Sequence, residues 1–347
     1  MSQLPWDLLD VISQKLDFDD LLRFACVCTN WRDFHKSNFM ASQEPLLVEF
    51  SPTQGPSSFS ILTNQKVYPL DKMMTHSNST MYVTYSSGYF ITVQSNNSFM
   101  LFNPFTRIGK VIYASTFQVN YSDYDKHRAL LAFEKCSEEF ALVVLCKDQP
   151  GSLHVYRSRK NAWFTYSAAG KILVDFVVLH NMIYVVTDRA RIGVLKLNSG
   201  NIKFLKLKNT SRVRLTLLKH DKTNPFINLV NCDENLIVVD LTPGACKLIY
   251  KIDLSSMSYV PSKSLGGIAL FYIWGGSCTA LSSPNRWGYK SNCLYQFFGF
   301  FPHIIEYNWD KSSKNYIHLP GPEKTLLNHL DRCFRHLKYQ LDYSLLD

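Results

Sequence analysis

The 347-residue sequence lacks the short motifs that hold nucleotides, catalytic metals or activated serines. It contains no His-Glu-x-x-His, no Gly-x-x-x-x-Gly-Lys-Ser/Thr phosphate loop, no Gly-x-Gly-x-x-Gly and no Gly-x-Ser-x-Gly. No constellation of paired carboxylates, or of a nucleophile beside a base, is recognisable along the chain. We therefore expect a non-enzymatic protein that needs no cofactor. A hydrolase or lectin would require converging acids or a metal cluster, which the sequence does not supply.

Cysteine is present without a pattern. The nine cysteines are an odd number, and their spacing matches no disulfide framework. Cys26 and Cys28 lack a second ligand pair, while Cys333 and His336 form the only close Cys/His pair, too few ligands for a tetrahedral site. We predict no metal site.

Long apolar runs are also missing. No run of about 18 or more apolar residues occurs, so no membrane span is expected. The chain does not open with a basic stretch followed by an apolar one, so secretion is not expected either. Reduced thiols and a location in the nucleus and/or cytoplasm follow as expectations.

What the chain does have is aromatic and strand-forming sequence. Aromatic residues make up 14% of it, and short apolar runs alternate with turn residues from about residue 46 to 319. Phe140–Cys146 and Leu173–Leu179 are examples of such runs. No connection has the length and period of a crossover helix, so antiparallel pairing is predicted. The runs recur at roughly 40–50 residues, which predicts a β-propeller of about six blades, with seven as the competing count, over residues 59–320.

The first residues differ from everything that follows. Leucines recur at helical spacing from Leu4, Pro5 suits a first helical turn, and Thr29 is placed to begin another helix. We predict three helices within residues 1–42 and a linker over 43–58. So short a bundle cannot bury all of its apolar side chains. They pack either on the rest of the chain or on the helices of a partner.

This segment resembles the F-box, the module that docks substrate receptors onto the Skp-family adaptor of cullin–RING ubiquitin ligases. The resemblance rests on the order of Leu4-Pro5, Leu8-Leu9, Ile12, Leu16, Asp20-Leu21-Leu22, Val27-Cys28 and Trp31-Arg32. It implies a substrate-recognition subunit of an SCF-type ligase. It also implies that the adaptor-binding surface, or its immediate support, consists of Leu4, Pro5, Leu8, Ile12, Leu16, Leu21, Val27 and Trp31.

A second resemblance covers most of residues 80–320. The segments that carry it are 102–106 (NPFT after Phe102), 180–186, 247–253, 265–271 and 292–297. They are similar to a plant group of F-box proteins, within the F-box/kelch-like set, whose C-terminal half is called domain of unknown function 295. The sequence departs from that pattern at Gly267, where the group has Asp, and at Leu294 and Gln296.

Residues 321–347 return to a helical period. Leu326, Leu330, Phe334, Leu337 and Leu341 are spaced for one face of a helix, and Pro322 suits its start. We predict a C-terminal amphipathic helix, packed on the rest of the chain or free to bind a partner.

Positive charge is concentrated in one place. The net charge is +9, and residues 187–222 hold ten Lys/Arg against two Asp. Such a stretch is either a solvated strand face or an electropositive surface that binds an acidic protein or nucleic acid, the latter disfavoured because no nucleic-acid module is present. In a non-ligase binding protein, this stretch would be the main functional feature. We predict target contact at Arg189, Arg191, Trp287 and Tyr289.

Overall fold

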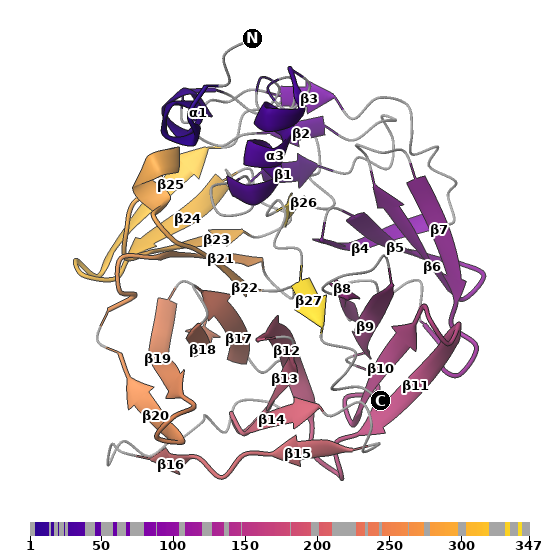
Figure 1. Ribbon diagram of the computed structural model, residues 1–347. Coiled ribbons are helices and arrows are strands. Elements are labelled where there is room, and N and C mark those ends of the chain that lie inside the picture. Colours follow the sequence, from indigo (N-terminus) through magenta and orange to yellow (C-terminus); the bar gives the residue numbers. More distant parts are fainter. Residues whose placement is uncertain are drawn as a thin grey trace.

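The computed structural model of the protein consists almost entirely of strands (Figure 1). The residues that it describes are 4–13, 15–16, 20, 24, 27–38, 46–49, 58–60, 67–69, 80–87, 89–103, 108–119, 127–134, 139–146, 148–180, 182–195, 201–209, 227–232, 235–242, 245–262, 264–273, 278–297, 303–318, 330–333 and 339–341. Within this part of the chain, no helix has the length and apolar character needed to cross a membrane.

The described strands form six sheets of four or five strands, arranged in a ring (Figure 1). Five sheets are built mainly from residues 80–318. The first contains β4 (Thr80–Ser86), β5 (Tyr89–Gln94), β6 (Ser98–Asn103) and β7 (Ile108–Tyr113). The second contains β8 (His127–Glu134), β9 (Phe140–Cys146), β10 (Ser152–Arg157) and β11 (Ala162–Ser167). The third contains β12 (Leu173–Leu179), β13 (Met182–Thr187), β14 (Ile192–Leu195) and β15 (Ile202–Phe204).

The next two sheets complete this part of the ring. One contains β16 (Lys208–Asn209), β17 (Ile227–Cys232), β18 (Asn235–Thr242), β19 (Ala245–Asp253) and β20 (Ser258–Pro261). The other contains β21 (Ala269–Ile273), β22 (Cys278–Leu281), β23 (Cys293–Phe297), β24 (His303–Asn308) and β25 (Ser313–His318). Most neighbours pair antiparallel as predicted, whereas β21 with β23 and β16 with β20 are parallel.

The sixth sheet joins two distant parts of the chain. It combines β1 (Leu46–Glu49), β2 (Ser58–Ser60) and β3 (Val67–Pro69) with β26 (Leu330–Cys333), which pairs antiparallel with β1. A last strand, β27 (Tyr339–Leu341), pairs parallel with β8 near the centre of the ring (Figure 1). These pairings satisfy strand edges that would otherwise expose unpaired backbone groups.

Two sequence predictions are therefore wrong. The predicted C-terminal helix is replaced, over its described residues, by β26 and β27. The predicted linker at 43–58 contains β1. In both places, backbone pairing with a distant strand outweighs the local pattern, because a strand edge gains hydrogen bonds that a surface helix would not supply.

The core consists of layers between neighbouring sheets. One buried cluster lies between the β8–β11 and β12–β15 sheets, including Leu153 and Phe176. Another lies between the β4–β7 and β8–β11 sheets, including Phe99 and Trp163. Because an inner strand is covered on both faces, β9 and β12 are buried at every position, which explains their continuous apolar runs.

Buried polar groups tie the inner strands together. Asp175 on β12 accepts backbone hydrogen bonds from the amides of Phe176 and Leu229, both at 2.8 Å, and its Oδ1 lies 2.5 Å from Arg128 Nη1 on β8. Ser86 on β4 likewise exchanges hydrogen bonds with the backbone of Leu131 on β8. One carboxylate therefore connects strands of three sheets.

The N-terminal segment forms a separate small cluster of helices. The structure describes α1 (Trp6–Ser13) and α3 (Thr29–Asn38), whereas most of the predicted second helix lies outside the described residues. Leu9, Phe24 and Phe34 form its buried core.

Candidate partner-binding surfaces

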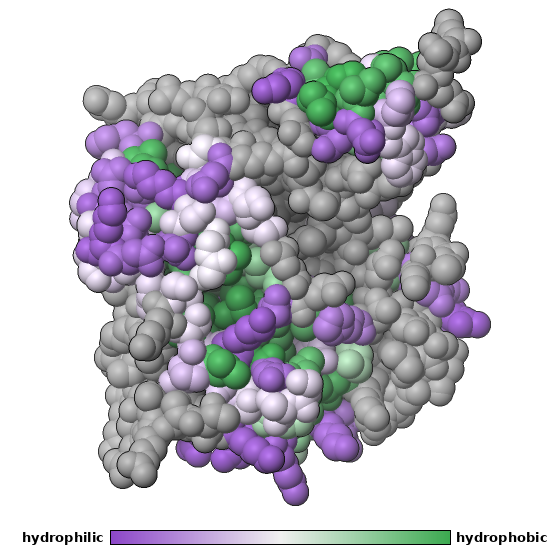
Figure 2. Space-filling model, turned by 60° about the vertical axis from the view of Figure 1, so that its left-hand side comes forward, coloured by the Kyte–Doolittle hydropathy of each residue, from purple (hydrophilic) through white to green (hydrophobic). Residues whose placement is uncertain are grey.

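The clearest candidate surface is an apolar patch on the N-terminal helices. Leu4, Trp6, Leu8, Val11 and Val27 are 37%, 47%, 50%, 57% and 60% exposed. In Figure 2, one hydrophobic (green) patch lies on the helical segment at the upper right. Large apolar side chains grouped in this way are typical of a protein interface.

The predicted adaptor-binding residues divide between this patch and the small core behind it. Leu4, Pro5, Leu8 and Val27 are exposed. The side chains that pack partly buried against the core are Ile12, Leu16 and Trp31. Leu21 lies outside the described residues.

Sequence reasoning missed Trp6 and Val11 as members of the apolar patch. The signal was available for Val11, which follows Leu8 by three positions and so shares its helix face.

Aromatic packing holds the patch in place. Phe24 and Trp31 have ring centroids 4.3 Å apart, and Trp6 meets the ring of Phe34 edge-on at 5.8 Å. The indole of Trp6 donates a hydrogen bond to Oδ1 of Asn30 at 3.2 Å. The two described helices thus form one unit, with α1 presenting its apolar face outward.

The second candidate surface is basic and lies on the β12–β15 sheet. Arg189 and Arg191 are exposed on the turn between β13 and β14. The hydroxyl of Thr187 accepts hydrogen bonds from both of their backbone amides, and the hydroxyl of Tyr259 donates to the carbonyl of Ala190 at 2.8 Å. The turn is therefore well anchored, with its two guanidinium groups in solvent.

Three more basic residues of the predicted stretch are exposed beyond this turn. They are Lys203 on β15, Lys206 and Lys208. The other five (Lys196, Arg212, Arg214, Lys219 and Lys222) lie outside the described residues.

The other two predicted target contacts, Trp287 and Tyr289, do not lie on the basic turn. Trp287 ends the short 3-10 helix Pro284–Trp287, and its side chain lies outside the description. Tyr289 is buried, contrary to the expectation of an exposed loop residue, because its ring meets those of Phe271 and Tyr295 edge-on at 5.0 and 5.2 Å. It belongs to the core of the β21–β25 sheet.

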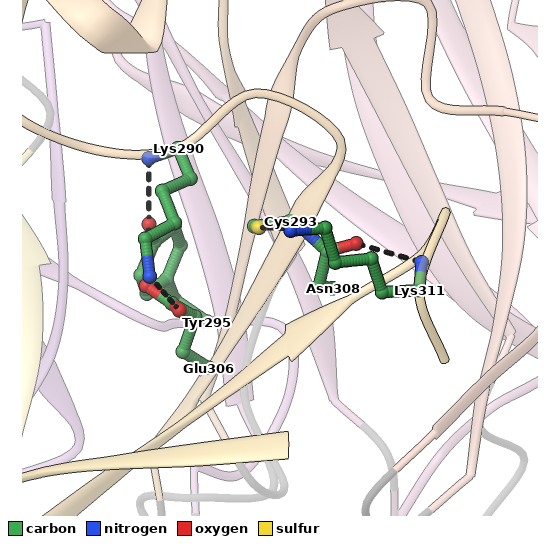
Figure 3. Close-up of polar contacts among 6 residues, drawn as sticks. All are labelled: Lys290, Cys293, Tyr295, Glu306, Asn308 and Lys311. Carbon is green, nitrogen blue, oxygen red and sulfur yellow. Dashed lines mark hydrogen bonds and ion pairs between the residues drawn. The ribbon is translucent and has the colours of Figure 1, made fainter. Parts of the chain in front are cut away.

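Beside Tyr289 lies a polar cluster that includes Lys290, Tyr295 and Glu306 (Figure 3). Lys290 Nζ lies 2.6 Å from Oε1 of the buried Glu306, and the Tyr295 hydroxyl donates to Oε2 at 3.1 Å. The hydrogen bond to Glu306 raises the pKa of Lys290, and burial raises those of Tyr295 and Cys293. All three side chains therefore keep their protons at neutral pH, which indicates a structural role.

A pocket of about 470 Å³ opens between the first two sheets of the β4–β25 series. It is lined by Ser95, Gln118, Val119, His127, Cys146, Asp148 and Gln149. Burial, reinforced by Asp148, raises the pKa of the Cys146 thiol to about 12, so the thiolate needed for nucleophilic attack is disfavoured. Among the described residues, no group of three or more His, Cys, Asp or Glu side chains is placed to hold a metal ion.

Comparison with known proteins identifies both parts of the chain. Residues 58–317 match the family described as KIB1-4 beta-propeller. The chain belongs to this family. Residues 1–39 match the F-box domain, so the N-terminal helices with the apolar patch are an F-box domain. A mainly β protein with an F-box and a β-propeller is thereby confirmed, whereas the kelch-like and domain-of-unknown-function-295 names and the plant origin stay predictions.

Individual relatives are more distant. The Arabidopsis thaliana protein named "Putative F-box protein At3g16210" is 23% identical over 179 residues, which cover 46% of each chain. The chain thus spans about half the length of this curated relative. The structure of apo AztD from Citrobacter koseri shares 12% identity, covers 69% of this chain and 60% of its own, and has a TM-score of 0.36, which is too low to support an argument.

Proposed function

We propose that this member of the KIB1-4 beta-propeller family is the substrate-recognition subunit of an SCF-type cullin–RING ubiquitin ligase. The F-box domain would bind a Skp-family adaptor, since F-box domains generally do so, and the propeller would hold a target protein. The protein would then act by proximity, raising the local concentration of the target near the ubiquitin carrier. Such a role requires no chemistry from the chain itself, and it fits a protein of the nucleus and/or cytoplasm.

The observation that carries this proposal is the apolar patch of the F-box. Among the described F-box residues, Leu9, Phe24 and Phe34 form a buried core, and Leu8, Val11 and the other exposed members of the patch lie outside it. Because these side chains are already about half covered, covering the rest contributes about half of the 1.5–3 kcal/mol for full burial, roughly 1 kcal/mol each. Several such side chains on one face are enough to anchor a stable complex.

Co-purification with a Skp-family adaptor tests the proposal. Leu8→Asp combined with Val11→Asp should reduce adaptor capture at least roughly tenfold, because an apolar interface cannot solvate the new carboxylates. Both side chains are at least half exposed, so the fold should be retained. The matched control is Val111→Asp on β7 of the propeller, a valine that is 44% exposed and should leave capture unchanged. Adaptor capture that survives the F-box substitutions would rule out the assignment.

The blade number is also a proposal. We infer one blade for each of the six sheets. Five of them draw their strands mainly from residues 80–318, and β26 adds to β1–β3 to make the sixth, which supports this count.

A second candidate function is a propeller that binds an acidic protein or nucleic acid outside any ligase. The exposed basic residues on the β12–β15 sheet favour it. The same adaptor experiment separates the two candidates, because only the ligase subunit requires the adaptor.

A further inference from the structure

One feature that the adaptor does not account for is the concentration of positive charge on the β12–β15 sheet. The exposed side chains are Arg189, Arg191, Lys203 and Lys206 on or beside this sheet and Lys208 on β16, which belongs to the next sheet. The half-buried Lys171, just before β12, completes the set. We call these six residues the basic surface.

The backbone brings the basic surface together from three separate segments. The amide of Asp188 donates to the carbonyl of Ile172 at 3.0 Å, which joins the turn before β14 to the connection that carries Lys171. The amide of Leu205 donates to the carbonyl of Ile192 at 2.8 Å, which joins β14 to the end of β15. The ammonium of Lys171 lies 4.3 Å from the ring centroid of Phe204. The three segments that carry the six charges therefore lie side by side, although they are separated in sequence.

Few acidic groups oppose these charges. Between residues 168 and 209, the described acids are Asp175 and Asp188. Asp175 is buried and paired with Arg128, so it does not offset the surface. Asp188 is half-buried within the turn. Across β20 from Lys208, Asp253 on β19 is a second partly exposed carboxylate. Two partly exposed carboxylates against six cations leave a field that attracts anions.

The turn that carries the two arginines is also rigid. Ala190 is buried between them with a positive φ of 51°, and Thr187 and Tyr259 hold its backbone by hydrogen bonds. A fixed backbone reduces the entropy lost when the guanidinium groups engage carboxylate or phosphate oxygens.

We propose that the basic surface is the docking site for an acidic segment of the target protein, one that carries carboxylate or phosphate side chains. This inference rests on the proposed function, which requires a polypeptide target. The chemistry also favours a polypeptide over single-stranded nucleic acid, which stacks its bases on exposed aromatic rings. Phe204 is the described aromatic residue on this surface, and it is partly buried beneath Lys171.

Direct binding to the full-length protein in complex with a Skp-family adaptor tests the inference. The probes are a short glutamate-rich peptide, a serine-containing version in unphosphorylated and phosphorylated forms, a glutamine version without charge, and a single-stranded RNA. We expect the glutamate or the phosphorylated peptide to bind, the glutamine version not to bind, and binding to weaken as ionic strength rises. Which of the two charged peptides binds more tightly tells carboxylate from phosphate as the source of the charge.

The decisive variants reverse charges in matched pairs. Arg189→Glu with Arg191→Glu should weaken peptide binding by roughly tenfold or more, since two attractions become repulsions. The control, Lys311→Glu with Lys314→Glu, changes the net charge equally at exposed positions of the β24–β25 hairpin and should have little effect. Circular dichroism at increasing temperature would verify that both variants fold alike.

Three outcomes would overturn the inference. These are peptide binding that survives the arginine reversals, equal loss in the lysine control, and RNA that binds more tightly than every peptide. The proposed function is judged separately, because adaptor capture depends on the F-box patch. Loss of adaptor binding with intact peptide binding would reject the ligase role and leave the basic surface in place.

Discussion

Removing the Asp175 carboxylate should destabilise the propeller more than any exposed substitution. Its side chain is 2% exposed, and it neutralises Arg128 while accepting the amides of Phe176 and Leu229. Asp175→Ala leaves a largely buried guanidinium without this counter-charge and two buried amides without these acceptors. Breaking a buried ion pair costs about 3–5 kcal/mol, and an unsatisfied amide about 1–3 kcal/mol. Since these terms overlap, we expect a loss of about 4–6 kcal/mol in the free energy of unfolding.

Urea unfolding followed by far-ultraviolet circular dichroism measures this loss. A double-mutant cycle with Arg128→Met isolates the charge pair, and the double variant should be more stable than the sum of the single losses implies, because neither charge is then left alone. Asp253→Ala is the control, since Asp253 also accepts hydrogen bonds from Ser255 and Ser256 but lies in solvent. A loss below about 1 kcal/mol for Asp175→Ala, or strict additivity in the cycle, would refute the reasoning.

Two further predictions concern the core. Burial lowers the pKa of His154, which stacks on Phe117, to about 4. The folded state therefore favours the neutral imidazole. The contribution of this group to folding stability is complete above pH 6.5 and is lost as the pH falls towards 4. The free energy of unfolding, measured from urea midpoints, should therefore fall by about 3 kcal/mol over that pH range. His154→Leu should make this fall smaller. Parallel pH profiles for the two proteins would contradict the prediction. At Gly193 on β14, an added Cβ would lie 2.7 Å from Ile202 Cγ2 on β15 and 2.9 Å from Val185 Cγ2 on β13, so Gly193→Ala should cost about 1–3 kcal/mol. A thermal midpoint equal to that of the unaltered protein would show that these two side chains can move aside at no cost.

Local sequence predicted the strands of the ring well where the chain is buried on both faces. The runs at Phe140–Cys146 and Leu173–Leu179 coincide with β9 and β12, because complete burial leaves a continuous apolar signal. Turn residues were equally informative. Ser87, between β4 and β5, and His180, between β12 and β13, separate the apolar runs of neighbouring strands and have positive φ.

The errors share a physical cause, which is pairing or packing between distant segments. The strands β26 and β27 are short, and their partners β1 and β8 lie far away in the sequence, so local periodicity cannot reveal them. Tyr289 stands between Gly288 and Lys290 in sequence and looks like a loop residue. Its burial depends on ring contacts with Phe271 and Tyr295, and no residue beside Tyr289 in the sequence indicates these contacts. In the F-box, spacing alone did not separate Ile12, which supports the core, from Val11, which faces solvent.

The pairing of β1 with β26 has a consequence for biosynthesis. When β1 leaves the ribosome, its partner at Leu330–Cys333 has not yet been made, and the inner edge of β8 stays unpaired until Tyr339–Leu341 is made. Contacts between residues so far apart in the sequence form slowly. Until they form, the unpaired strand edges can pair with other strands or other chains. The ring can therefore close only after residues 330–341 have been made, and a nascent chain halted before residue 330 would still display both edges to chaperones.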